Sequence, residues 1–123
     1  MVLTFKIPCL PPSLNQYLTP IWHRKQMILT KKARDFKSQA YIYVPSADMS
    51  GDQRYKVEVE YHGQFYNKGN GKIKKKDGQN LDKCLYDVIF DKLGVDDSVV
   101  FEGSWKKVHN VKEEFTLVTI TKL

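Results

Sequence analysis

"NLDKCLYDVIFDKLG", residues 80–94, is the stretch of sequence that decides the fold. Its apolar residues recur every three or four positions, which predicts a helix with one buried face. The helix is expected to end at Gly94, because glycine is common just after the last helical turn. Asn80, Lys83 and Asp87 are spaced i, i+3 and i+7 and share the opposite face. The apolar face consists of Leu81, Cys84, Leu85, Val88, Ile89 and Leu93.

The segments on either side predict four strands and one more helix. Residues 3–7 and 55–61 alternate between apolar and polar side chains, as half-buried strands do. From Thr30, a predicted N-cap, apolar residues recur at helical spacing until a proline stops the pattern. Residues 98–107 and 114–122 are rich in β-branched and aromatic residues and predict the last two strands.

Length and composition predict one domain that spans residues 1–123. A chain of 123 residues with 41% apolar residues is long enough for one hydrophobic core and too short for two. The predicted order β-α-β-α-β-β is typical of an α+β fold in which helices cover one face of a sheet. The order of the strands within the sheet cannot be read from this pattern.

The charge favours a polyanionic partner. The formal net charge is +6 and the isoelectric point is about 9.3, although charge alone distinguishes nucleic acid only weakly from an anionic membrane. We find no signal peptide and no apolar stretch long enough to span a membrane. Two cysteines, Cys9 and Cys84, are too few for a disulfide framework. We therefore expect a reduced, cytoplasmic protein.

Acidic residues flank the helix at residues 80–94. Asp77 precedes it, where the helix dipole favours an anion, while Asp96 and Asp97 follow Gly94. Taken singly, these residues are explained by helix capping and turn formation. Together with Lys83 they suggest phosphodiester hydrolysis, because magnesium binds carboxylate oxygens and a lysine stabilises charge on phosphoryl oxygens.

Basic residues cluster in two segments that we expect to contact DNA. Those of residues 67–80 alternate with glycines and predict a loop that binds backbone phosphates without reading sequence; the alternative is a solvated loop. Trp22 and Tyr17 are candidates for stacking on unpaired bases. The predicted phosphate contacts are Lys68, Lys72, Lys74, Lys75 and Lys76 in this loop, and Arg24, Lys25 and Lys31 further upstream.

Two blocks of the sequence resemble the RusA-like Holliday junction resolvases. "IPCLPPSLNQYL", residues 7–18, is similar to the family's Pro-x-Pro-Pro-Ser-x-Asn-x-Tyr signature. "DGQNLDKCLYDVIFDKLGVDDSVV", residues 77–100, resembles its Asp-x-Asp-Asn-x-x-Lys-x-x-x-Asp pattern followed by a second acidic pair. The resemblance implies a two-layer fold with a mixed sheet. It also implies a homodimer that cuts four-way DNA junctions with magnesium, for which manganese can substitute.

The resemblance also assigns roles to residues. It implies that Asp77, Lys83 and Asp97 are catalytic and that Asp77 and Asp97, with Asp96 nearby, bind the metal. Gln79, Asn80 and Asp87 would support them. A rival register that places Asn80 and Asp82 on the acids would put Tyr86 in the position of the lysine, and we reject it.

Gln79 departs from the family pattern, which has a second catalytic aspartate at this position. An amide offers a metal only a neutral carbonyl oxygen. Two functions stay open: an active resolvase, or a junction-binding protein that has lost efficient cleavage. A basic interaction domain without a nucleic-acid role is a weaker alternative. Four other acids are candidates to supply the carboxylate oxygen that Gln79 lacks: Glu58, Glu60, Asp82 and Asp96.

Overall fold

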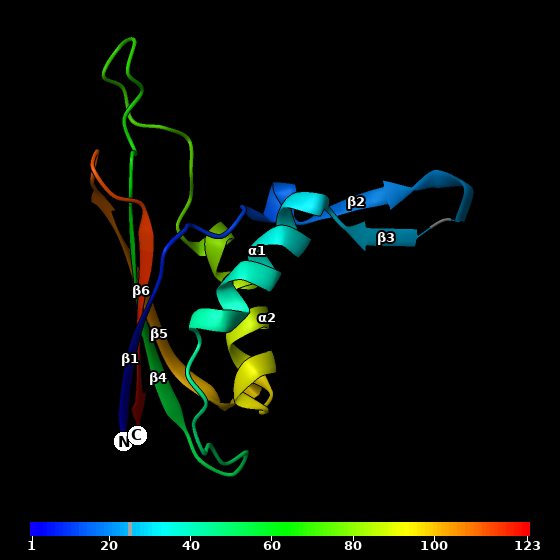
Figure 1. Cartoon of the computed structure of the whole chain (residues 1–123), viewed down its shortest axis with the longest axis vertical. Coiled ribbons are helices and arrows are strands. Elements are labelled where there is room, and N and C mark those ends of the chain that lie inside the picture. The colour runs from blue at the N-terminus through cyan, green and yellow to red at the C-terminus, as the bar shows by residue number, and fades with distance from the viewer. Residues whose placement is uncertain (25) are drawn as a thin grey trace.

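The computed structural model describes residues 1–24 and 26–123, apart from the side chain of Arg24. It has the predicted α+β architecture, with two helices packed on one face of a mixed sheet (Figure 1). The helices are α1 (Lys31–Tyr43) and α2 (Gln79–Leu93). The strands of the main sheet are β1 (Val2–Ile7), β4 (Tyr55–Gly63), β5 (Val100–His109) and β6 (Phe115–Lys122).

The main sheet has the strand order β1-β6-β4-β5, which the sequence pattern left open. β4 and β5 are parallel, whereas β6 is antiparallel to both β1 and β4. A parallel pair needs a crossover connection, and α2 supplies it. The segment from the end of β4 to the start of β5 therefore carries α2 across the helix-covered face of the sheet.

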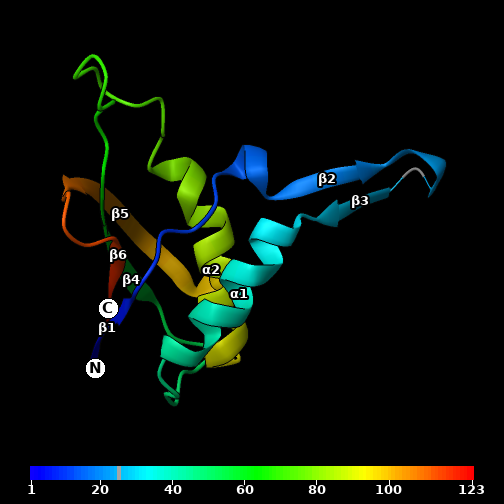
Figure 2. The same ribbon diagram turned by 45° about the horizontal axis from the view of Figure 1, so that its top comes forward.

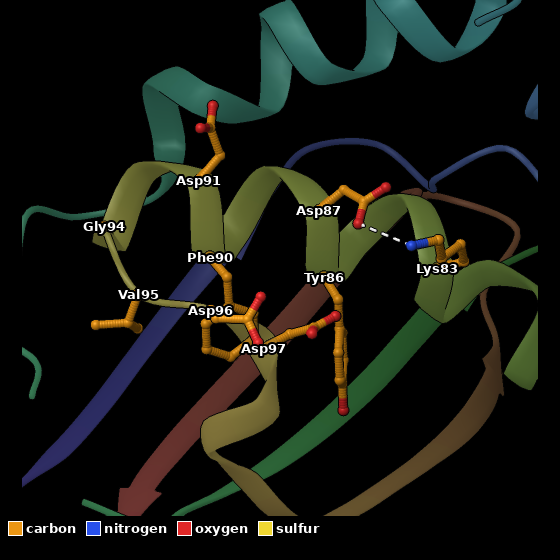
Figure 3. A pocket seen from close by; sticks show the side chains of 9 residues that line it. All are labelled: Lys83, Tyr86, Asp87, Phe90, Asp91, Gly94, Val95, Asp96 and Asp97. Atoms are coloured by element: carbon orange, nitrogen blue, oxygen red, sulfur yellow. Dashed lines mark hydrogen bonds and ion pairs between the residues drawn. The ribbon is translucent and has the colours of Figure 1, made fainter. Parts of the chain in front are cut away.

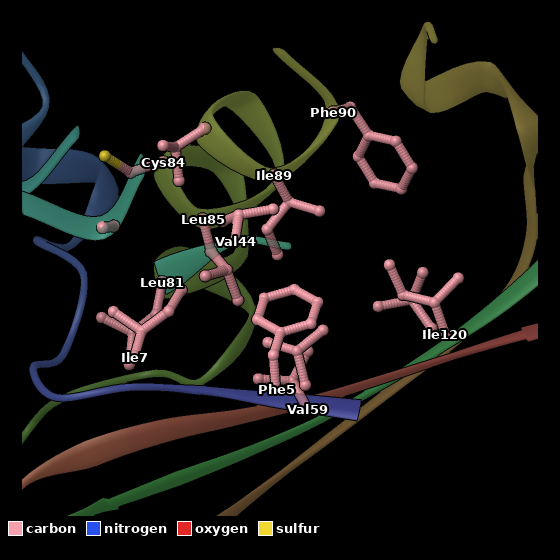
Figure 4. Close-up of a cluster of buried hydrophobic side chains, with 14 of the residues drawn as sticks. Phe5, Ile7, Val44, Val59, Leu81, Cys84, Leu85, Ile89, Phe90 and Ile120 are labelled. Atoms are coloured by element: carbon pink, nitrogen blue, oxygen red, sulfur yellow. The ribbon is translucent and has the colours of Figure 1, made fainter. Parts of the chain in front are cut away.

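One hydrophobic core lies between the helices and the sheet (Figure 4). The predicted apolar face of α2 is buried, and Leu81, Leu85 and Ile89 are fully inaccessible to solvent. Alternate residues of β4 face the same core, as the period of two predicts. Val57 and Tyr61 are fully buried. The core therefore fixes which face of α2 remains available to a substrate.

The ends of the helices agree with the sequence at two positions and differ at a third. The Thr30 side chain accepts a hydrogen bond of 3.1 Å from the Ala33 amide and caps α1. Gly94 ends α2 in the left-handed conformation, with φ at 75°. The N-cap of α2 is Gly78, which has no side-chain cap, so the expectation that a nearby acid or amide caps this helix is wrong.

A two-stranded arm is the feature that the sequence analysis missed. β2 (Leu18–Ile21) and β3 (Gln26–Leu29) pair with each other and stand away from the helices and the main sheet in both views (Figures 1 and 2). At its base the Thr30 amide donates a 3.0 Å hydrogen bond to the Tyr17 carbonyl. Short 3-10 turns complete the fold: η1 (Leu14–Gln16), η2 (Trp22–Arg24) and η3 (Asp97–Val99).

Both cysteines are free thiols. Burial raises the pKa of the Cys84 thiol to about 11. Within the residues that the structure describes, no helix has the length and apolar character needed to cross a membrane.

Candidate active site

An open pocket of about 500 Å³ lies along the exposed side of α2 (Figure 3). The apolar face of α2 is turned into the core, so its polar residues line this pocket together with the acidic turn that follows Gly94. The structure thus brings together residues that the sequence predicted from two separate motifs. The lining residues are Lys83, Tyr86, Asp87, Phe90, Asp91, Gly94, Val95, Asp96 and Asp97.

Asp87 is the most connected side chain of the pocket. Its Oδ1 accepts a 3.2 Å hydrogen bond from Lys83 Nζ, one turn earlier on the same helix. Its Oδ2 accepts a hydrogen bond from the Tyr17 hydroxyl and lies 3.6 Å from Lys37 Nζ. Lys37 Nζ also donates a 2.9 Å hydrogen bond to the Tyr17 oxygen. Three segments of the chain therefore meet at one carboxylate.

Lys83 is a permanent cation at this site. Its hydrogen bond to Asp87 and the Asp87 charge raise the pKa of the Lys83 ammonium, and Tyr17 and Asp97 add smaller contributions. Its side chain is 55% exposed. A raised pKa keeps the ammonium protonated at neutral pH, so Lys83 is suited to binding phosphoryl oxygens and not to accepting a proton.

Asp96 and Asp97 differ in what they offer to a ligand. The Asp96 side chain accepts a 3.0 Å hydrogen bond from the Ser98 amide, which commits one oxygen to the η3 turn. Hydrogen bonding by the Ser98 side chain, and then by this amide, lowers the pKa of Asp96. The Asp97 carboxylate has no hydrogen bond or ion pair to another described side chain. It is close enough to Lys83 and Tyr86 to affect the pKa of both.

Tyr86 also lines the pocket. Burial, followed by the charges of Asp82 and Asp97, raises the pKa of Tyr86 to about 12, so the phenol stays protonated. A Cβ placed on Gly103 would lie 3.1 Å from the Tyr86 hydroxyl, so the phenol reaches across to β5. Tyr86 therefore keeps an un-ionised phenol whose hydroxyl lies next to β5.

Asp77 lies outside this pocket, just before the N-terminus of α2. Its Oδ2 accepts a 3.4 Å hydrogen bond from the side-chain amide of Asn80, so two of the residues predicted to form the site are in contact. Asp97 lines the pocket, whereas Asp77 does not. Within the described part of the chain, no three His, Cys, Asp or Glu side chains are placed to hold a metal ion together.

A comparison with models of protein families identifies the family of this chain. Residues 8–121 match the family described as Endodeoxyribonuclease RusA. The chain belongs to the RusA family. This is a family of Holliday junction-resolving endonucleases, so the expected relationship is confirmed over nearly the whole chain. A comparison with curated proteins finds no match.

The acids fit a magnesium ion in their chemistry. Magnesium is held by oxygen ligands and often by only one or two carboxylates together with water and substrate phosphates. Asp77 and Asp97 are exposed carboxylates with little or no engagement elsewhere. The RusA-family site in this chain therefore suits an ion that shares its coordination with DNA, and not one enclosed by protein ligands alone.

Gln79 is the first residue of α2 and is exposed. It precedes Lys83 by four residues and so lies on the same face of the helix. Two of the acids expected to replace its missing charge are excluded by the sheet. Glu58 and Glu60 lie on the face of β4 opposite the buried residues that contact the helices. Asp82 accepts a hydrogen bond from the buried Tyr61 hydroxyl, and burial raises the pKa of Asp82.

The lysine-rich loop lies between β4 and α2, directly before Asp77. A 2.7 Å hydrogen bond from the Asn67 amide to the Lys72 carbonyl and a 2.8 Å bond from the Lys74 amide to the Phe65 carbonyl fold it back on itself. Lys76 is partly buried, and this burial lowers the pKa of its ammonium. The exposed lysines of the loop are Lys68, Lys72 and Lys75, while Lys74 is partly buried.

Three of the predicted DNA contacts lie outside the lysine-rich loop. Lys31 begins α1 and is exposed. Lys25 and the side chain of Arg24 lie outside the described residues. Trp22 is 83% exposed near the tip of the arm and remains a candidate for stacking. Tyr17 is only 6% exposed, so the expectation that it stacks on bases is wrong.

Lys37 is the site residue that the sequence analysis missed. It follows Phe36 on α1 and borders the apolar face of that helix, which is the only signal that the sequence carried. In the structure it lines a second pocket of about 700 Å³ between α1 and α2, which shares Asp87 and Asp91 with the first. The two pockets therefore adjoin along the exposed side of α2.

Proposed function

We propose that this chain is a structure-selective endonuclease that cleaves four-way DNA junctions with magnesium and acts as a homodimer. The observation that carries the proposal is that Lys83 and the unengaged Asp97 carboxylate line the same open pocket, within a RusA-family chain. The exposed lysines of the preceding loop lie next to the same helix and provide attraction for the phosphate backbone.

The residues divide the work as follows. Asp97 and Asp77 would hold the magnesium ion, with Asp96 nearby. The ion, when bound, supplies positive charge at the phosphate and favours ionisation of the attacking water. Lys83 places its ammonium in the pocket to stabilise charge that builds on the phosphoryl oxygens. Asn80 restrains the Asp77 carboxylate through their hydrogen bond.

A homodimer follows from the symmetry of the substrate. A four-way junction has two equivalent strands to be cut, and one chain of 14.3 kDa carries one such site. Two copies related by a two-fold axis would present two equivalent sites. Manganese, which accepts the same oxygen ligands, is expected to replace magnesium.

The test is cleavage of a labelled four-way junction with magnesium and then manganese, beside binding of the same junction in chelator. Asp97→Asn should abolish cleavage and leave binding unchanged or tighter, because it removes a negative charge that repels phosphate. Asp52→Asn, in the exposed turn before β4, is the matched control and should cut normally. Cleavage that survives in Asp97→Asn at full rate would refute the assigned site.

A second function is favoured by one observation. Gln79 places a neutral amide on the same helix face as Lys83, so the site has one negative charge fewer than the family pattern. A protein that binds junctions without cutting them would give tight, junction-selective binding in the same experiment and no nicks with either metal. Binding that fails to weaken steeply with salt would exclude both functions.

A further inference from the structure

We propose that Tyr17 and Lys37 are positioning residues that set the place of the Lys83 ammonium by holding Asp87. This inference rests on the proposed role of Lys83 and adds two residues to the site. Neither residue lies near Lys83 in sequence. They reach its partner Asp87 because the segment before the arm and helix α1 both pack against α2.

The contacts divide the two oxygens of Asp87 between different partners. Oδ1 accepts from Lys83, while Oδ2 accepts from the Tyr17 hydroxyl and faces Lys37. Lys37 also donates to the Tyr17 oxygen, so it orients the phenol whose proton points at Asp87. The hydrogen-bond chain therefore runs from Lys37 through Tyr17 to Asp87, and Lys83 meets the other side of the same carboxylate.

The side chains around Asp87 differ in how much they can move, and the least mobile ones determine the orientation of its carboxylate. Tyr17 is buried, and its main chain is held by hydrogen bonds to Leu14 and Thr30. The Lys37 and Asp87 side chains are only 27% and 24% exposed, against 55% for Lys83. Tyr17 and Lys37 thus set the orientation of the Asp87 carboxylate. The more flexible Lys83 side chain then places its ammonium where it can donate a hydrogen bond to Oδ1.

The charges make this arrangement useful to a phosphate-binding site. An isolated Lys83–Asp87 pair would be neutral, and its ammonium would be committed to the carboxylate. With Lys37 on the other oxygen, the single negative charge of Asp87 is shared by two positive charges, so this carboxylate alone does not neutralise the Lys83 ammonium. The groups that face Lys83 are Asp87 on its own helix, Tyr17 before the arm and Asp97 in η3.

The simpler alternative is that Tyr17 only fastens the N-terminal segment to α2. Both roles predict some loss of stability when the hydroxyl is removed, so stability cannot separate them. Only the positioning role predicts that the cleavage step slows while DNA binding is retained. Only the positioning role also predicts that arginine at position 37 supports cleavage nearly as well as lysine does.

The first experiment compares Tyr17→Phe, Lys37→Met and Lys37→Arg with wild type. The dissociation constant for the junction in chelator should stay within about twofold of the wild-type value in all three variants. The single-turnover cleavage rate at saturating protein should fall about 10- to 100-fold in Tyr17→Phe and Lys37→Met, which is the usual effect of losing a residue that orients a site residue. Lys37→Arg should recover most of the rate. Tyr43→Phe on α1 and Lys56→Met on β4 are matched controls and should match wild type.

The second experiment does not depend on cleavage. The nitrogen signal of the Lys83 ammonium, assigned by its loss in Lys83→Arg, should shift in Tyr17→Phe and Lys37→Met and stay in place in both controls. If wild type fails to cut DNA, the proposed nuclease function fails while this signal still decides the inference. An unmoved Lys83 signal in both folded variants, or an unchanged cleavage rate, would overturn it.

Discussion

Gln79 lies four residues before Lys83 on the same face of α2, where the family pattern has an acid. Replacing it by aspartate restores a negative charge beside the proposed metal ligands without disturbing the core, because the position is exposed. We expect Gln79→Asp to raise the rate of magnesium-dependent junction cleavage, measured under single-turnover conditions. Asn80→Asp is the control, and an equal gain from it would count against the register that places Gln79 at the site.

Gly78 is required for a steric reason. A Cβ on this residue would overlap the indole ring of Trp105, which packs directly against the N-terminus of α2 beside Asp77. We expect Gly78→Ala to lower the free energy of unfolding by about 1–3 kcal/mol, the usual cost of overpacking. Urea denaturation measures it. Gly51→Ala, where the new methyl group meets open space, should leave the unfolding midpoint near that of wild type.

The candidate site was predictable from the sequence where helical spacing alone places the residues. The positions of Lys83 and Asp87 followed from the apolar face of residues 80–94. The contacts of Tyr17 and Lys37 with Asp87 did not, because they depend on how α1 and the segment before the arm pack against α2. The alternation of residues 55–61 had already placed Glu58 and Glu60 on the polar face of their strand, and the structure shows that this face is the one away from the helices.

At the scale of elements, the lysine-rich loop predicts a salt-dependent affinity. Lys74 and Lys75 are adjacent to the site in sequence and are not deeply buried. Replacing both with alanine should reduce the slope of log binding constant against log salt concentration by about 1.8, the value expected for two lost phosphate contacts. Junction binding measured over a series of salt concentrations tests this.

The control for this loop is the pair Lys56→Ala and Lys122→Ala. These residues lie at the end of the sheet where β4 and β6 pair near the chain termini. They should leave the slope unchanged. An equal change of slope in this control would mean that the net charge of the molecule, and not the loop, provides the attraction.

Elements with a buried face were predicted well, and the arm was not. The residues of α2 and β4 repeat with periods that one-sided burial imposes, and Gly94 marked the end of α2. The arm made of β2 and β3 has no buried stripe, since most of its described side chains are exposed or only partly buried. Without one-sided burial there is no hydrophobic period to read, and Pro20 argued further against a strand.

At the scale of the whole molecule, the proposed dimer gives a direct prediction. Sedimentation of the purified protein without DNA should give a mass of about twice that of the 14.3 kDa chain. The complex with a junction should likewise contain two chains. A junction complex that contains one chain would contradict the proposal of two equivalent sites. The order of strands in the main sheet could not be predicted, because alternation of side chains reports burial and not the identity of the neighbouring strand.

The central position of β6 has a consequence for how the protein is made. β6 pairs with β1 on one side and β4 on the other, so residues near the start of the chain join the sheet only through residues 115–122. During translation, Asp77, Lys83 and Asp97 leave the ribosome before the strand that unites the sheet. A nascent or truncated chain that lacks β6 leaves β1 and β4 without a shared partner and exposes the core. Nuclease activity should therefore arise only after synthesis has passed the last strand.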